Sequence, residues 1–295
     1  MSDLKQLSDH VYYLPAGVNT VILKNGNDAI LVDTGQDKNY GRALRKACEK
    51  LGVTPAAIIN THSHADHYGG NDYLLRQFDV PVYAPHFEAS IMQSPYLEPV
   101  YLFNGAKPLP ELLSKWLLAK PSRVDYDLIE GTLELAGLSL TIIDTSGHAH
   151  QQRSLVCDGV LIAADALFGA SVLDRYPLPF GQDIARQIAS AENLSTLDVS
   201  VTLPGHGDPA SNLQEIVDTN LKAFQTAAKV VFEACQGLST ETVLKAVCDA
   251  LDIAITDLPR YYLNLCVVSS YLSYLRDEGK VLLELKDNAL IWSQA

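Results

Sequence analysis

Residues 61–70 read Thr-His-Ser-His-Ala-Asp-His-Tyr-Gly-Gly and place three of the eight histidines within six positions, with an aspartate among them. Neutral imidazole and carboxylate are ligands that borderline divalent metals accept. The apolar run at 56–59 comes just before this stretch and predicts a buried strand that ends where the histidines begin. A tight loop there can present its first two histidines to one side and the aspartate with the third histidine to another, so that one loop serves two ions.

Three further ligand-type residues also follow predicted strands. His148 comes after the predicted strand 138–143, Asp165 ends the predicted strand 160–164, and His206 stands in Pro-Gly-His-Gly just past a strand at 199–203. Because a layered α/β protein gathers the loops at its strand ends, we expect these side chains to lie beside the histidine loop.

The remaining pattern predicts the fold class. An Asn-Gly turn at 25–26 between apolar runs indicates a hairpin near the N-terminus, and residues 40–51 have helical spacing. Strands return between 133 and 164, and a long helix is predicted over 212–235. Strands followed by helices, repeated twice along the chain, indicate a layered α/β sandwich.

Two segments fall outside that repeat. Residues 93–121, rich in proline and aromatic side chains, predict a partly helical insertion that covers a pocket. Residues 237–295 predict two helices and a hairpin turning at 286–288, a small winged-helix-like module after a main domain over 1–236. Five basic and eight acidic residues give this module a net charge of −3, so we expect it to serve packing or a homodimer contact rather than nucleic-acid binding.

Composition restricts the class of protein. The chain carries 22 basic and 35 acidic residues, a net charge of −13, which disfavours a phosphate backbone as partner. The first residues lack a basic stretch followed by an apolar one, and no uncharged apolar run approaches the roughly 18 residues of a membrane span. The five cysteines are widely spaced, as for reduced thiols. We expect a cytoplasmic protein with a small-molecule substrate and no membrane partner.

The motifs together resemble the metallo-β-lactamase superfamily, and within it the glyoxalase II-like metallo-hydrolases. The H-x-H-x-D-H motif of that family is matched by residues 62–67. Four shorter elements match in the family's order and are Asp33-Thr34-Gly35, Gly147-His148, Ala164-Asp165 and Gly205-His206. The resemblance implies a four-layer αββα sandwich, the metallo-β-lactamase fold, followed here by the small C-terminal module.

The resemblance also implies a dinuclear site. The family pattern assigns His62, His64 and His148 to one metal, Asp66, His67 and His206 to the other, and Asp165 to a bridge between them. We expect two divalent ions per chain, zinc first, with iron or manganese as alternatives. Asp33 matches an element that supports the metal loop and is not a ligand.

Three positions carry further expectations. Asp66 is expected to act in catalysis as well as in metal binding. His150 stands where many relatives have a small residue or proline, and either faces the substrate as a catalytic residue or packs beside the site. Ala164 replaces a glycine common in the family, a change that matters only where the backbone must approach a metal closely.

We therefore predict a metal-dependent hydrolase that uses a hydroxide held by two metals to cleave a small ester, thioester or lactone. One alternative is a phosphodiesterase or ribonuclease with the same site, which the acidic charge disfavours. The other is a persulfide dioxygenase-like oxidoreductase with a single iron. True β-lactamases resemble the chain less, because they generally lack the bridging aspartate that Asp165 supplies.

Overall fold

Seven strands of the N-terminal half form the first sheet, in the order β1-β2-β3-β4-β5-β6-β7. The computed structural model describes residues 3–295. The predicted hairpin joins β3 to β4, with Asn25 opposite Asp28 across a two-residue loop, and β4 to β7 then run parallel. The strands are β1 (Lys5–Gln6), β2 (Val11–Leu14), β3 (Thr20–Asn25), β4 (Asp28–Val32), β5 (Thr54–Ile59), β6 (Val82–Ala84) and β7 (Tyr126–Asp127).

Five strands form the second sheet, in the order β12-β11-β10-β9-β8. Neighbouring strands are antiparallel except for β11 and β12, which are parallel. The strands are β8 (Gly131–Leu135), β9 (Leu138–Asp144), β10 (Arg153–Cys157), β11 (Val160–Ala164) and β12 (Val201–Pro204).

The two sheets stack face to face around a shared apolar core. Side chains alternate along each strand, so Ile30 of β4 and Ile162 of β11 enter this central core, while their neighbours Leu31 and Leu161 face outward. Burial on both faces explains why β4 and β11 read as continuous apolar runs.

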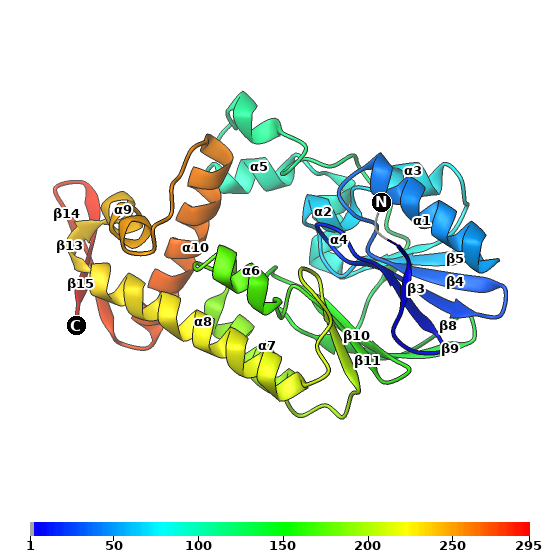
Figure 1. Cartoon of the computed structure of the whole chain (residues 1–295). Helices are drawn as coiled ribbons and strands as arrows, with labels where there is room; N and C mark the ends of the chain where they lie inside the picture. Colours follow the sequence, from blue (N-terminus) through cyan, green and yellow to red (C-terminus); the bar gives the residue numbers. More distant parts are fainter. Residues whose placement is uncertain (1–2) are drawn as a thin grey trace.

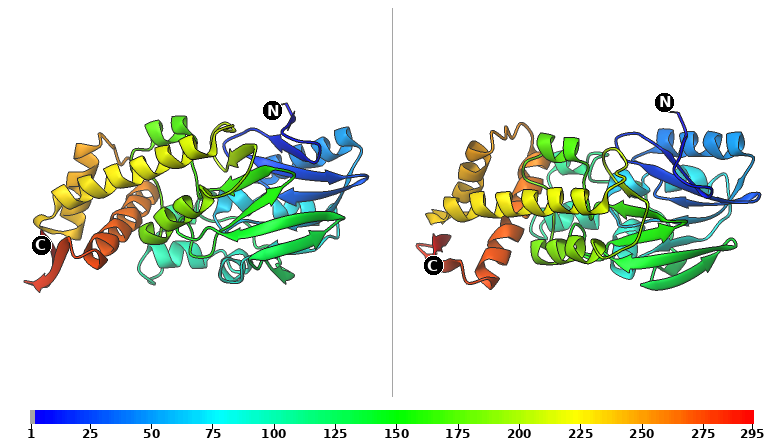
Figure 2. Two further views of the ribbon diagram at one scale, coloured as in Figure 1. Left: turned by 90° about the horizontal axis from the view of Figure 1, so that it is seen from below. Right: turned by 60° about the horizontal axis from the view of Figure 1, so that its bottom comes forward.

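Helices cover both outer faces, which completes four layers (Figures 1 and 2). Leu44 of α1 and Leu74 of α3 pack on the first sheet, and Leu194 of α7 and Phe224 of α8 pack on the second. The predicted αββα sandwich is confirmed, although α6 and α7 were not predicted. The helices are α1 (Lys38–Leu51), α2 (Ala65–Tyr68), α3 (Asn71–Leu75), α6 (Ala170–Arg175), α7 (Ile184–Leu194) and α8 (Leu213–Ala234).

The segment 93–121 follows α4 (His86–Gln93) and contains α5 (Leu97–Leu102) and a short 3-10 helix (Pro110–Leu113). Its buried leucines, Leu102, Leu112 and Leu117, pack against Tyr262 and Cys266. The insertion is therefore anchored on α10, a helix of the C-terminal segment, and its function as a cover stays a prediction.

The C-terminal segment follows α8 in the order strand, helix, helix, strand, strand that winged-helix modules use. Its three strands form a separate sheet in the order β13-β15-β14. Val231 of α8 lies in the same core as Val243 and Val268, so the proposed boundary at residue 236 crosses a continuous apolar core, and the two-domain division stays a prediction. The elements are β13 (Gln236–Ser239), α9 (Thr240–Ala250), α10 (Leu258–Asp277), β14 (Val281–Lys286) and β15 (Ala289–Gln294).

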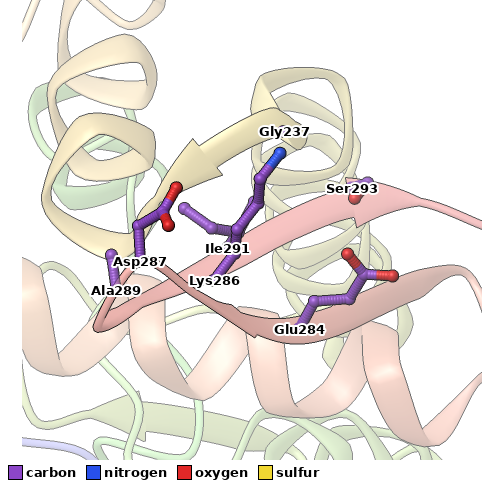
Figure 3. A pocket seen from close by; sticks show the side chains of 7 residues that line it. All are labelled: Gly237, Glu284, Lys286, Asp287, Ala289, Ile291 and Ser293. Atoms are coloured by element: carbon purple, nitrogen blue, oxygen red, sulfur yellow. The ribbon is translucent and has the colours of Figure 1, made fainter.

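Figure 3 shows a hollow on this third sheet, lined by residues of β13, β14, β15 and their turn. Glu284 and Asp287 are its acidic lining residues, and none of the groups of three or more ligand-type residues found among the described residues lies there. Across the described residues 3–295, no helix combines the length and apolar character needed to cross a bilayer.

Candidate metal centre

The fold brings together all seven residues predicted as metal ligands. The histidine loop follows β5, His148 follows β9, Asp165 follows β11 and His206 follows β12. Each ligand-type residue therefore stands at the C-terminal end of a strand, and the stacking of the two sheets places these four ends at one edge.

Three histidines form the first group of ligand-type atoms. His64 Nδ1 lies 3.1 Å from His62 Nε2 and 2.9 Å from His148 Nε2. His62 and His148 are buried. The three nitrogens converge on one point, as three ligands of one ion would.

Asp66, His67 and His206 form the second group. His206 Nε2 lies 3.4 Å from the Asp66 carboxylate. Asp165 stands between the groups, because its carboxylate is 3.3 Å from His148 Nε2, 3.3 Å from His206 Nε2 and 3.4 Å from His67 Nε2. It has the position that a bridging ligand requires.

The outer ring nitrogens of four histidines have partners of their own. His62 Nδ1 lies 3.0 Å from Thr61 Oγ1, and the Nδ1 atoms of His148 and His206 face the carbonyl oxygens of Phe180 and Gly17 at 3.1 and 2.5 Å. His67 Nδ1 lies 2.7 Å from Asp33 Oδ2. Such partners orient each ring so that Nε2 faces the cluster, as they do around bound metals.

Asp33 connects the end of β4 to the histidine loop. Besides its contact with His67, its carboxylate accepts hydrogen bonds from Thr61 N at 2.9 Å and from Thr61 Oγ1 at 2.8 Å. The carboxylate thus contacts both Thr61, at the start of the loop, and the ring of His67, near its end. A supporting role for Asp33, outside the ligand set, accounts for these contacts.

Glycines allow the close approaches that the loop requires. A Cβ on Gly70 would lie 2.2 Å from the Thr34 carbonyl oxygen, and a Cβ on Gly205 would lie 2.0 Å from Asp165 Oδ1. Ala164 has a φ of 48°, in the left-handed region that favours glycine. The family's glycine at this position is therefore explained by the backbone conformation.

The histidines of the two groups differ in charge. Burial lowers the pKa of His64 to about 4 and that of His148 to about 3, so these rings are neutral. Burial also opposes charge on His67, but the carboxylates of Asp165, Asp33 and Asp66 outweigh it and raise its pKa to about 10. Without metal, His67 is therefore protonated, and its positive charge offsets the carboxylates that would otherwise face a metal cation.

The donor set fits divalent metal ions. His67 Nε2 and Asp165 Oδ1 are buried and face each other at 3.4 Å, yet neither has a hydrogen-bond partner among the described residues. Buried polar atoms are nearly always paired, so two inward-facing atoms without partners indicate a missing cation. Imidazole and carboxylate in these numbers suit zinc, iron or manganese.

His150 is the one predicted site residue that the structure leaves outside the cluster. It is exposed, and its ring lies edge-on to Phe87 at 5.3 Å between centroids. It belongs to none of the groups of ligand-type atoms found among the described residues. A catalytic role for His150 stays a prediction.

Glu88 of α4 is a site residue that the sequence analysis missed. It is 1% exposed, and its carboxylate accepts hydrogen bonds from Ser63 N and Ser63 Oγ at 3.1 and 2.5 Å and from Gln151 N at 3.0 Å. It thereby ties the histidine loop to the loop that carries His148. No motif marks it, because a glutamate in a short helix is ordinarily a surface residue.

Comparison with known proteins agrees with this geometry. The family model described as the metallo-beta-lactamase superfamily matches residues 13–206. The chain is 30% identical to the "probable metallo-hydrolase YybB" of Bacillus subtilis over 218 residues, which cover 70% of this chain and 91% of that protein. It is 28% identical to the "probable metallo-hydrolase YqgX" of the same organism over 206 residues, or 68% of this chain and 90% of the relative.

Solved structures match the fold over nearly the whole chain, the C-terminal module included. The metallo-beta-lactamase family protein TTHA1429 of Thermus thermophilus aligns with a TM-score of 0.75 at 21% identity and covers 97% of this chain and 99% of its own. A beta-lactamase domain protein of Burkholderia ambifaria also gives 0.75, at 19% identity, with 99% and 94% covered. Given the family model that spans the ligand-type residues, the chain belongs to the metallo-beta-lactamase superfamily.

Proposed function

We propose that the protein is a dinuclear metal-dependent hydrolase that cleaves a small ester, thioester or lactone. The observation that carries the proposal is the arrangement of two three-residue groups, with Asp165 between them. His62, His64 and His148 would hold one ion, and Asp66, His67 and His206 the other. Two divalent ions bound there would acidify a shared water and polarise the carbonyl oxygen of a substrate.

The chain's own residues prepare the site for that chemistry. The Asp66 side chain is 34% exposed, against 4% for Asp165, and is thus the ligand-type carboxylate open to a substrate. We assign to it the orientation of the attacking water and the acceptance of its proton. Phe180 lies edge-on to His64 and to His148, 5.3 Å between centroids in each case, and forms an apolar wall on one side of the cluster.

The proposal is tested by metal analysis together with a substrate panel. Protein purified without added metal is analysed for zinc, iron and manganese, then assayed with esters, thioesters, lactones and lactams after metal loading. We expect about two ions per chain, zinc first, and turnover of at least one acyl class that His64→Ala loses. Turnover no greater than that of His64→Ala on every class would contradict the proposal.

The same measurements separate the two alternatives. The winged-helix order of the C-terminal segment favours an RNA-cleaving enzyme, but its eight acidic and five basic residues oppose RNA binding. RNA cleavage at low salt would replace the small-molecule assignment. A content of about one iron per chain, together with oxygen uptake on a persulfide, would indicate an oxidoreductase in place of a hydrolase.

A further inference from the structure

Glu98 is a buried carboxyl group that the proposed reaction does not use. It lies in the first turn of α5, within the insertion, and is 4% exposed. Its side chain forms no hydrogen bond and no ion pair with any of the described residues 3–295. Burying an ionised carboxyl group without a partner is unfavourable, so Glu98 is a candidate to receive a cationic group of a ligand.

Helix α5, which carries Glu98, contacts the loop that packs on the metal centre. Tyr101 is three residues further along α5 and so lies on the same face. The hydroxyl oxygen of Tyr101 accepts a hydrogen bond from Gln182 Nε2 at 3.3 Å. Gln182 follows Phe180, the side chain that packs on His64 and His148, by two positions. The loop 180–182 therefore joins this face of α5 to the metal-ligand histidines.

The charged side chains that act on Glu98 are two carboxylates. Burial raises the pKa of Glu98 well above its ordinary value, and the Asp66 and Glu88 carboxylates raise it further. Asp66 belongs to the metal groups, and Glu88 is already occupied by Ser63 and Gln151. Neither side chain offers a cation to Glu98, and a ligand group that carries its own carboxylate or phosphate beside Glu98 would be repelled by the Glu98 carboxylate.

We propose that Glu98 binds an ammonium group of the substrate, so that the site selects small acyl compounds carrying an amine. The inference rests on the proposed function, because it assumes metal ions at the cluster. In this arrangement the metal groups receive the acyl carbon, while α5 receives the cationic end. Selectivity then comes from repulsion of anionic analogues as well as attraction of the amine.

The test uses thiols, because a thiolate binds the metal and its other end is then free to contact Glu98. Differences in affinity between thiols with different end groups therefore measure the contribution of that contact. Cobalt(II)-loaded protein is titrated with aminoalkanethiols of increasing length and with hydroxyl- and carboxylate-ended thiols of matched length. Binding is followed by the thiolate-to-cobalt absorption band, which requires no turnover. We expect the best aminothiol to bind at least about tenfold more tightly than its hydroxyl counterpart, as for a charge-assisted hydrogen bond, and the carboxylate to bind most weakly.

Variants test whether Glu98 causes the preference for amino-ended thiols. Glu98→Gln should bind amino- and hydroxyl-ended thiols equally, whereas Glu98→Asp should keep the preference and shift it toward a longer aminothiol. Glu111→Gln removes an exposed carboxylate from the same insertion and should behave as the original protein does. Equal binding of all tails by the original protein, or a preference that survives in Glu98→Gln, would overturn the proposal. Absence of the absorption band with every thiol would instead refute the metal centre and the proposed function.

Discussion

The substitution Asp33→Asn tests whether the second group of ligand-type residues depends on its carboxylate support. Asp33 Oδ1 accepts from Thr61 N, and Oδ2 accepts from Thr61 Oγ1 and faces His67 Nδ1. An asparagine has one acceptor oxygen, so its NH₂ group must face either the Thr61 N–H or the His67 ring. In the second case His67 Nδ1 becomes the acceptor, and the proton moves to Nε2, the atom proposed to bind metal.

The size of the effect follows from these contacts. One buried hydrogen bond to a charged group is lost or reversed, which is worth about 1.5–3 kcal/mol. Since about 1.4 kcal/mol corresponds to a tenfold change in affinity, metal binding at the second group should weaken by about 10–100-fold. The group of His62, His64 and His148 has no direct contact with Asp33 and is linked to it only through the Thr61 hydroxyl, which contacts His62, so its affinity should change less than that of the second group.

The assay is a competitive titration of metal-free protein with zinc against a chromophoric chelator, which resolves the tighter and the weaker binding step. Circular dichroism checks that the variant is folded. Asp198→Asn, at an exposed position, is the control for loss of one negative charge. Two binding steps unchanged in Asp33→Asn would refute the reasoning, and so would an equal loss in the Asp198 variant.

Other predictions follow from the same cluster. Glu88→Gln removes an acceptor shared by two loops and should weaken zinc binding by about tenfold in the chelator competition. Gly205→Ala directs a Cβ at Asp165 Oδ1, so elemental analysis should find metal lost from purified protein. In metal-free protein, the pKa of His67 in the folded state, about 10, exceeds its ordinary value of 6.5, so the stability that its proton contributes is complete below about pH 6.5 and is lost as pH rises toward 10. Urea unfolding across that range should show the decline, and an increase in stability would contradict it.

Local patterns were sufficient for most elements of the sandwich. The Asn-Gly hairpin, the doubly buried strands and α8 appear where apolar runs and turn residues predict them. Helix α7 escaped prediction because its buried face includes the polar residues Gln187 and Ser190 between Ile184 and Leu194. Polar residues at buried positions interrupt the apolar stripe by which an amphipathic helix is recognised.

The site shows the same division. Residue types and their spacing at strand ends were enough to predict which seven side chains would meet, because strand ends gather by the topology of any such sandwich. Glu88 and Glu98 carry no motif, and nothing in their neighbours along the chain marks them as buried.

By itself, then, the sequence determined the layered fold, the ligand-type residues and the strand ends that carry them. Only the tertiary structure decided which ring nitrogens face inward, that His150 stays outside the cluster, and that Glu88 and Glu98 are buried. The physical reason is that periodicity records which face of an element is apolar, whereas the direction of a polar side chain is set by partners far away in the chain. Asp33 and His67 are such a pair. They are 34 positions apart in the chain, yet Asp33 Oδ2 lies 2.7 Å from His67 Nδ1.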